Sequence, residues 1–428
     1  MKRLLLGALL AFALCVAPPS AGVAIGSPVL GDFDIPSQHP ARANELRRVS
    51  DPRRVRIEMN ADLGGPVVHA SGAQDAINAA IDHLDRRPGA VFISTDAGIG
   101  VVGIGGATNS AADAGNPVVA AEGARLAAME ASLDARRRIA ELLGRLGGRG
   151  RETVTQQASA LDGSGADAGA SMRRMLRGAV VYDRLETSDP DERRIVIVTT
   201  PRSEGRVQQV AHGVIAAWSM EAGLTAVFSQ IGADASPASG AWVVGVAQSG
   251  DVAWVAYGAA PIRQHADSGV QRQLRDEAFR AAEQRARRAM VQAVQGEAIE
   301  APEGFGPRVQ RIEREIGSLL DPDRSTGRAI GGIASRVAAA GVSEDHIRSI
   351  TRGAMPAGVQ LRTYTSADGS WAQAVCVLTL RSEDAARRLS ATLGRAPLGS
   401  PSRLGVPLRT GDDGLLLLND RGEPVPAR

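Results

Sequence analysis

The feature that most constrains this chain is a sequence pattern that occurs twice. Met172–Ala179 read Met-Arg-Arg-Met-Leu-Arg-Gly-Ala, and Ile347–Ala354 read Ile-Arg-Ser-Ile-Thr-Arg-Gly-Ala. Each copy leads into two apolar runs with a polar tip between them. Each of these segments closes on Arg-Ser-Glu, at Arg202–Glu204 and at Arg381–Glu383. A duplication on this scale predicts two repeats of one fold in the same chain.

The first half of each repeat is predicted to form a β-hairpin and then a long helix. Asp96–Gly98 and Ser249–Asp251 each separate two apolar runs, and glycine and aspartate suit tight turns between strands. The expected strands are residues 91–95 and 99–107 in the first repeat and 242–248 and 252–260 in the second. Apolar residues at helical spacing then predict long helices over residues 118–146 and 269–295.

The second half of each repeat is predicted to be a second hairpin and a short helix. The expected strands are residues 178–187, 193–200, 359–365 and 371–380, and the helices that follow them are 205–220 and 384–393. The stretch 147–170 is rich in Gly, Ala, Ser and Asp and is predicted to be a flexible excursion, whereas 300–341 is expected to be partly helical. We therefore expect an α+β fold of two tandem repeats, each an antiparallel sheet packed against a long helix.

The beginning of the chain is typical of a secretory signal. Lys2 and Arg3 precede an apolar run that is too short to span a bilayer, and small residues follow it. Cleavage after Ala21, Gly22 or Ala24 fits this pattern equally well. Cys15 raises lipidation as an alternative, although the bulky Leu14 before it favours a place inside the apolar run. We therefore expect an exported protein, periplasmic or associated with the cell envelope, with no later transmembrane segment.

Composition and patterning divide the chain into five segments. They are a signal peptide at 1–22, a polar and poorly ordered N-terminal arm at 23–71, repeats at 72–220 and 221–395, and a linker with a C-terminal hairpin at 396–428. An additional short helix is expected at 73–84, where isoleucine and leucine recur at helical spacing.

Composition excludes several classes of function. Without the signal, 47 basic residues face 47 acidic ones, so no net positive charge favours nucleic acid, and aromatic residues make up only 3% of the chain. Lys2 is the only lysine, which excludes Schiff-base chemistry and phosphate-binding loops that need a lysine in the mature chain. Cys376 has no partner for an internal disulfide, and its apolar neighbours predict a buried thiol.

Three motifs resemble functional sites, and each has a simpler interpretation. Gly98–Gly103 matches the dinucleotide-binding pattern, but no helix begins at it, so a glycine-rich strand is expected. Asp321–Gly327 opens like a calcium loop but lacks the closing glutamate, which favours a turn over a weak ion site. The acidic tip at 189–192 is followed by Arg193 and Arg194, which are expected to balance its charge.

No catalytic, cofactor-binding or metal-binding residue is assigned, and no cofactor is expected. The six histidines are far apart in the sequence, at positions 39, 69, 83, 212, 265 and 346, and they form no zinc motif. A run of three arginines at 136–138 lies along the first long helix. The arginines at 285, 287 and 288 are expected to face solvent and to pair with glutamates at helical spacing, with an anion-binding face as the alternative.

The order of elements resembles the envelope domains of small outer-membrane lipoproteins and of flagellar-assembly protein T, and more loosely the SIMPL-type periplasmic domains. The resemblance rests on Gly123 with Glu130-Ala131, on Arg177-Gly178-Ala179 and on their second copies, and covers about 89–204 and 240–383. It implies structural or assembly roles in the envelope and supplies no catalytic residues. This chain departs from the lipoproteins because it lacks a convincing lipidation motif.

These observations favour an exported, non-enzymatic envelope protein that acts as a binding or assembly module. Its partner is expected to be another envelope protein or a second copy of itself, not nucleic acid. The alternative is an exported hydrolase whose serine, histidine and aspartate come together between the repeats. Such an enzyme would need a pocket that holds a histidine within hydrogen-bond reach of a serine and a carboxylate.

Overall fold

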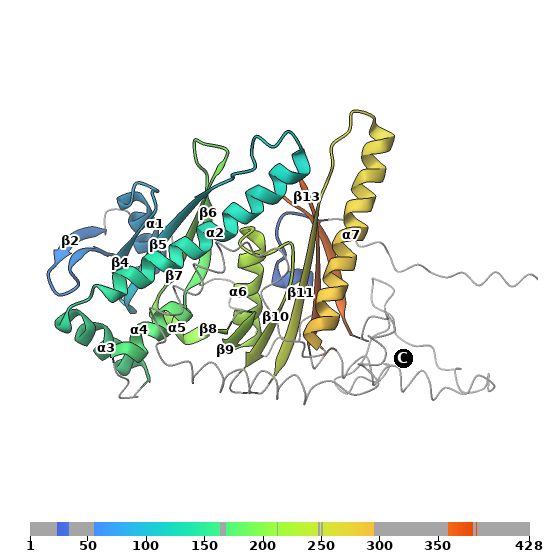
Figure 1. The fold of residues 1–428 in the computed structure, drawn as a ribbon. Coiled ribbons are helices and arrows are strands. Elements are labelled where there is room, and N and C mark those ends of the chain that lie inside the picture. The colour runs from blue at the N-terminus through green and yellow to red at the C-terminus, as the bar shows by residue number, and fades with distance from the viewer. Residues whose placement is uncertain are drawn as a thin grey trace, which may run out of the picture.

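The computed structural model describes residues 24–33, 55–162, 168–211, 213–246, 249, 251–294, 358–379 and 382. They form two sheets, each with one long helix across a face, as Figure 1 shows. Several expectations lie outside these residues: the signal peptide, the calcium-loop-like segment, the second copy of the duplicated motif and the C-terminal hairpin. Within the described part of the chain, no helix is long and apolar enough to cross a membrane.

The first repeat is a six-stranded sheet between two helices. Its strand order is β2-β3-β4-β5-β7-β6. The strands are β2 (Arg56–Asn60), β3 (Gly65–His69), β4 (Gly89–Thr95), β5 (Gly98–Thr108), β6 (Val180–Leu185) and β7 (Glu192–Thr199). The crossover helix α1 (Ala73–His83) joins β3 to β4, which therefore pair in parallel, while the other neighbours are antiparallel.

The two faces of this sheet form two separate hydrophobic cores. Ile77 and Ile81 of α1 pack with Ile93 on one face. Ile139 of the long helix α2 (Pro117–Gly144) packs with Phe92 on the other. Each buried aliphatic or aromatic side chain contributes about 1.5–3 kcal/mol through removal from water. Because neighbouring strand residues point to opposite faces, both helices are needed to cover the sheet.

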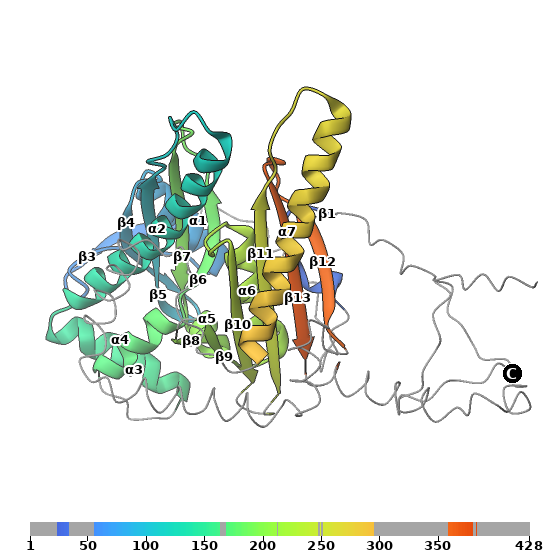
Figure 2. The same cartoon turned by 45° about the vertical axis from the view of Figure 1, so that its right-hand side comes forward.

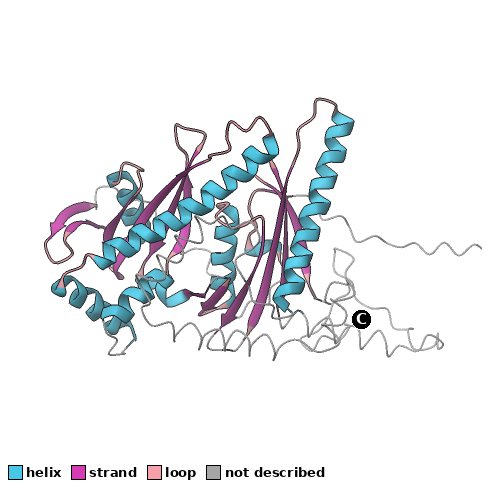
Figure 3. Cartoon of the chain, in the orientation of Figure 1, coloured by secondary structure: helices cyan, strands magenta, loops and turns pink. Residues whose placement is uncertain are grey.

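The second repeat has the same topology in a seven-stranded sheet, ordered β1-β12-β13-β11-β10-β9-β8. Its strands are β1 (Ala24–Ile25), β8 (Val207–Ala211), β9 (Val214–Ala217), β10 (Ser239–Val246), β11 (Val252–Pro261), β12 (Gln360–Thr365) and β13 (Trp371–Thr379). Helix α6 (Met220–Gly232) is the crossover, and the long helix α7 (Ser268–Val294) covers the opposite face. Figure 2 shows α2 and α7 each running along its own sheet, and Figure 3 shows each group of strands beside its long helix.

The predicted α+β class and its two sheet-bearing halves are confirmed, as are the four hairpins and both long helices. The sheets themselves are mixed and not purely antiparallel, because each repeat includes one helical crossover between parallel strands. The glycine-rich segment at 98–103 lies in β5, as the strand interpretation predicted.

The prediction of a helix over residues 205–220 was wrong. The short helix α5 (Pro201–Arg206) is followed by β8 and β9, and Gly213, with a φ of +69°, turns the chain between these two strands. Their alternating apolar residues suit a strand with one buried face. The second sheet therefore begins at β8, upstream of the expected repeat boundary between 220 and 221.

The predicted N-terminal arm and excursion also contain ordered elements. Residues 56–69 supply β2 and β3, and β1 (Ala24–Ile25) pairs in parallel with β12. The excursion contains α3 (Gly148–Asp162) and leads into α4 (Ala168–Arg177). Val154 of α3 and Met175 of α4 are buried in the first core, and this burial outweighs the glycine- and serine-rich composition.

A glycine in each repeat fixes how closely the long helix approaches the sheet. A Cβ atom on Gly105 would lie 1.9 Å from the carbonyl oxygen of Ala131, and one on Gly258 would lie 2.2 Å from that of Ala282. The two glycines occupy matching places in the sheets, opposite Ile195 and Ala374. Ala131 therefore corresponds to Ala282, so the sequence match between Glu130-Ala131 and Glu277-Ala278 does not reflect structural equivalence.

The repeated Arg-Ser-Glu sequence marks the same capping arrangement after the last strand of each repeat. The backbone N–H of Thr200 donates to Ser203 Oγ at 2.8 Å, and that of Ser203 donates back to Thr200 Oγ1 at 3.1 Å. Thr379 and Ser382 exchange the same pair of bonds, both at 3.0 Å. Each pair satisfies backbone donors where a strand ends.

Candidate functional site

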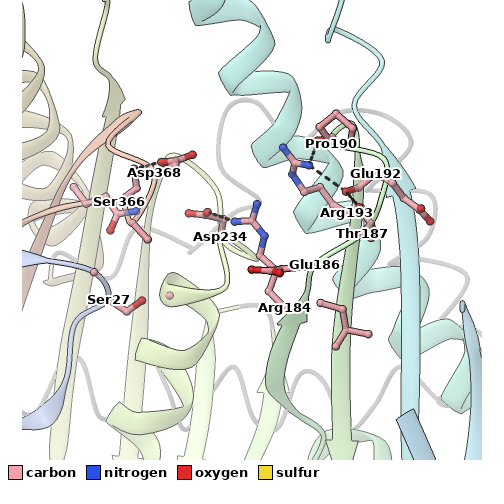
Figure 4. A pocket seen from close by; sticks show the side chains of 15 residues that line it. Ser27, Arg184, Glu186, Thr187, Pro190, Glu192, Arg193, Asp234, Ser366 and Asp368 are labelled. Atoms are coloured by element: carbon pink, nitrogen blue, oxygen red, sulfur yellow. Dashed lines mark hydrogen bonds and ion pairs between the residues drawn. The ribbon is translucent and has the colours of Figure 1, made fainter. Parts of the chain in front are cut away.

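The two repeats meet at a cleft of about 480 Å³ that both of them line. Two hairpin tips form its opposite walls. The first tip (residues 186–191) joins β6 to β7, and the second tip (residues 366–370) joins β12 to β13. The tips occupy equivalent places in the two repeats. Figure 4 shows Arg184 and Arg193 on one wall, Ser366 and Asp368 on the other, and Asp234 between them.

Arg125 of α2 joins the first repeat to the second beneath this cleft. Its side chain is only 4% exposed, and its guanidinium lies 5.0 Å from the ring centroid of Tyr257 and 5.4 Å from that of Trp371. It donates to Ser236 Oγ at 3.0 Å and pairs with Asp234 at 3.3 Å. A buried arginine that stacks on two rings and meets a carboxylate is a strong, geometrically specific contact.

The ring beneath Arg125 belongs to a tyrosine that stays neutral. Burial raises the pKa of Tyr257 to about 12, although the positive charge of Arg125 acts in the opposite direction. The phenol therefore supplies an aromatic face to the guanidinium and carries no charge at neutral pH. Its position in the fully buried interior of β11 fits a structural role.

Asp234 is shared between arginines from two different elements of the first repeat. Its Oδ1 atom meets Arg125 of α2 at 3.3 Å, and its Oδ2 atom meets Arg184 of β6 at 3.1 Å. The residue follows the last turn of α6 and has a φ of +54°, a conformation that aspartate tolerates better than most residues. This carboxylate therefore pairs with one arginine through each of its oxygens at the floor of the cleft.

The predicted charge balance of the first tip is only half realised. Arg194 pairs with Glu192 through two bonds of 2.8 Å and donates to the carbonyl of Arg86 at 2.7 Å. Arg193 donates only to the backbone carbonyls of Pro190 and Glu192, and within the described residues no carboxylate lies within 4 Å of it. Burial, and then the neighbouring charge of Arg184, lower the pKa of Arg193.

The second tip carries an ionised carboxylate held by its own turn. Asp368 accepts hydrogen bonds from Ser366 Oγ at 2.6 Å, from Ser370 Oγ at 2.7 Å and from the Ser370 backbone at 3.0 Å. Burial acts to raise the pKa of Asp368, but these hydrogen bonds, with a smaller contribution from Arg184, hold it below its usual value. The second tip therefore presents a fixed negative charge to the cleft at neutral pH.

The described residues do not assemble the hydrolase alternative. His69 is the last residue of β3 and lies 3.9 Å from Glu58, while His83 ends α1 and His265 bonds within an exposed turn. His39, His212 and His346 lie outside the described residues, and the described lining of the cleft includes no histidine. The described part of the chain also contains no cluster of three metal-ligating side chains.

The arginine runs of the two long helices are divided between solvent and packing. Arg287 and Arg288 are exposed as predicted, and Arg287 pairs with Glu283 at 3.7 Å. Arg137 and Arg138 both pair with the buried Asp134, and Arg136 donates to the carbonyl of Ala179 at 3.2 Å. In α7, Arg285 donates to the carbonyl of Ala259, so it faces the sheet and not solvent. No sequence motif marks the residues that join the repeats at the cleft, Arg125, Arg184 and Asp234. Each is a single charged residue whose partner is distant in the sequence.

Comparison with known proteins adds little to this geometry. No family model matches the chain, and no curated protein matches it. A hypothetical protein of Francisella tularensis with a solved structure is 13% identical, and the alignment covers 72% of this chain and 90% of that one, with a TM-score of 0.24. A likeness at this level supports neither a shared fold nor a shared function. The resemblance to envelope domains stays a prediction.

Proposed function

We propose that this protein is an exported, non-enzymatic component of the cell envelope that acts as a binding or assembly module, and that its partner docks in the cleft between the repeats. One observation carries the proposal. Two equivalent hairpin tips face each other across the cleft, and the half-buried Arg193 meets no carboxylate there among the described residues. A charge that is partly removed from water, and that Asp191, Asp234 and Asp368 balance only at longer range, favours a ligand that pairs with it directly.

The surroundings of the cleft support binding over catalysis. Arg125 and Asp234 fix the position of the two repeats below the tips, whereas Ser188 and Ala367 at the tips are exposed. A rigid base with exposed, polar loops is the common arrangement of recognition surfaces. The charged groups in the cleft are arginines and carboxylates, which are suited to holding a ligand in a defined orientation.

Photo-crosslinking in the intact envelope tests this proposal. A photoreactive residue replaces Ser188 in one variant, Ala367 in a second and the exposed Glu152 of α3 in a control. Amine-reactive reagents would be ineffective because the mature chain lacks lysine. We expect the same discrete adduct, to another envelope protein or to a second copy, from both tips and not from Glu152. Absence of any adduct at both tips would contradict docking at the cleft.

A further inference from the structure

The first sheet has an open edge at the end away from the second repeat. β2 stands first in the strand order, and among the described strands it pairs only with β3. Its four residues from Arg56 to Met59 are all exposed, and the strand lies at the end of the first sheet that points away from the second (Figure 1). None of the residues that line the cleft belongs to β2. This edge is therefore a second surface, separate from the proposed docking site.

The backbone of β2 directs alternate residues toward the open edge. The N–H of Ala70, which follows β3, donates to β4, so every second residue counted back from it, including Pro66, faces β4. Met59 is opposite Pro66, and Ile57 lies two residues earlier, so the N–H and C=O groups of Met59 and Ile57 point away from β3. Proline has no N–H to donate, and in this arrangement the ladder between β2 and β3 loses no bond to it. β2 therefore offers backbone donors and acceptors at Ile57 and Met59 to an additional strand.

The side chains of β2 form an apolar row on one face and a charged row on the other. Ile57 is opposite Val68 of the core beneath α1, and Ile57 and Met59 are 46% and 79% exposed. Arg56 and Glu58 lie on the other face and pair with each other at 2.9 Å, with side chains that are 69% and 47% exposed. An edge strand that exposes large apolar side chains is an expected site of pairing with another chain.

We propose that two copies of this chain associate through their β2 strands, which pair antiparallel about Ile57 and join the two six-stranded sheets into one. Each Ile57 is then opposite Ile57 of the second copy, so the outward backbone groups meet and the apolar rows become continuous. Arg56 of each copy is opposite Glu58 of the other. Sliding one strand by two residues would keep the backbone bonds but would place glutamate opposite glutamate or arginine opposite arginine. The alternating charges, which would repel many other strands, therefore specify a second copy in this register.

Charge exchange tests the register, with sedimentation velocity over a concentration series as the measure of dimer formation. Arg56→Glu places glutamates opposite each other and Glu58→Arg places arginines opposite each other, so each variant should weaken the dimer roughly tenfold. A mixture of the two variants should recover it, because every opposed pair then has opposite charges. The matched control Arg87→Glu alters a similarly exposed arginine that pairs with Asp85 outside β2, and it should leave the dimer unchanged.

Hydrogen exchange locates the interface in the unmodified protein. The amides of Ile57 and Met59 should exchange more slowly as the protein concentration rises, whereas that of Glu58, which already faces β3, should not change. A monomer at every concentration would overturn the inference, as would a dimer that both single variants leave intact or that their mixture fails to restore. Protection of Ile57 and Met59 at every concentration would show that the chain covers this edge itself, and would equally overturn it. None of these outcomes bears on crosslinking from the tips, so the proposed function stands or falls separately.

Discussion

At the scale of single residues, the two repeats use side chains of opposite charge to bond the long helix to the backbone of its sheet. The backbone N–H of Gly106, next to the close-approach glycine of β5, donates to Asp134 Oδ2 at 3.1 Å. At the matching place in the second repeat, the carbonyl of Ala259 accepts from Arg285. Each long helix thus adds a polar bond beside the point where it contacts its sheet. The residue type differs because one site supplies a donor and the other an acceptor.

Asp134 should contribute measurably to stability at neutral pH. Burial acts to raise the pKa of Asp134, but hydrogen bonds from Arg137, Arg138 and Gly106 outweigh it and lower the pKa below its usual value. Its contribution is therefore complete above the unfolded-state pKa and is lost as the pH falls through the lower folded-state value. We expect Asp134→Asn to reduce the free energy of unfolding by roughly 1–3 kcal/mol at pH 7.

Urea unfolding at a series of pH values measures this effect. The difference between the wild type and Asp134→Asn should shrink as the pH falls below about 4. The control is Glu141→Gln, because Glu141 is 38% exposed and pairs with arginines at 3.7 and 3.8 Å. Exposed pairs contribute little, so this control should change stability by less than about 0.5 kcal/mol. A difference that stays constant across the acidic range would contradict the charge-based explanation.

The buried thiol of Cys376 should be inert until the second sheet opens. Burial raises the pKa of Cys376 to about 12, and the side chain is fully covered within β13. Because the thiolate is the reactive form, both effects suppress its reaction with thiol reagents. In a Cys15→Ser variant, which leaves one thiol, we expect labelling at pH 8 only after denaturant is added. Rapid labelling of the folded protein would show that the sheet opens locally at this strand.

At the scale of elements, the distance between each long helix and its sheet depends on one glycine. We expect Gly105→Ala and Gly258→Ala each to destabilise the protein by roughly 1–3 kcal/mol, because the added Cβ would overlap the helix backbone. Gly245→Ala in β10 is the matched control, since its Cβ would meet no atom within 4 Å. Thermal unfolding monitored by circular dichroism provides the comparison. Equal effects at all three positions would point to strand propensity and not to helix contact.

Local patterns predicted the elements that local chemistry determines. Turn residues between apolar runs located the four hairpins, and helical periodicity located α2 and α7 to within a few residues. The strands β8 and β9 were missed because each is short. The helix between β9 and β10 can be recognised as a crossover only after both strands have been identified. The helices α3 and α4 were missed because long-range burial of Val154 and Met175 stabilises them.

The cleft could not be predicted from sequence for a related reason. Arg125 and Asp234 are separated by 109 positions, and neither belongs to a motif. The fold brings them together only after both sheets form. The predicted charge balance of the acidic tip, by contrast, was partly correct, since Arg194 pairs with Glu192 within the same hairpin. Charge pairs within one element are therefore visible in a sequence, whereas those between repeats are not.

At the scale of the whole molecule, two contacts tie the repeats together in different ways. The segment that precedes the first repeat pairs with the second, through β1 on β12 and through Tyr364, whose hydroxyl donates to Asp32 at 2.9 Å. Arg125 then inserts from the long helix of the first repeat into the aromatic core of the second. The chain therefore crosses between repeats in both directions, which favours cooperative unfolding of the two.

Replacement of Arg125 should uncouple the two repeats. All four tryptophans lie in the second repeat, from Trp218 to Trp371, so their fluorescence reports on that repeat while circular dichroism reports on both. In the wild type we expect the two signals to follow one urea transition. In Arg125→Ala, the partly exposed Asp234 keeps only its partner Arg184, and we expect the lost ion pair and ring contacts to cost roughly 2–4 kcal/mol.

The decisive observation is the separation of the two transitions in the variant. Arg145→Ala is the control, because Arg145 lies at the end of the same helix but is 76% exposed and makes only a surface pair with Glu141. It should leave one shared transition and change stability by less than about 1 kcal/mol. If Arg125→Ala instead lowered stability while both signals still coincided, the repeats would be held together mainly by the N-terminal segment. Removing the Tyr364 hydroxyl with Tyr364→Phe should then produce the separation that the arginine variant did not.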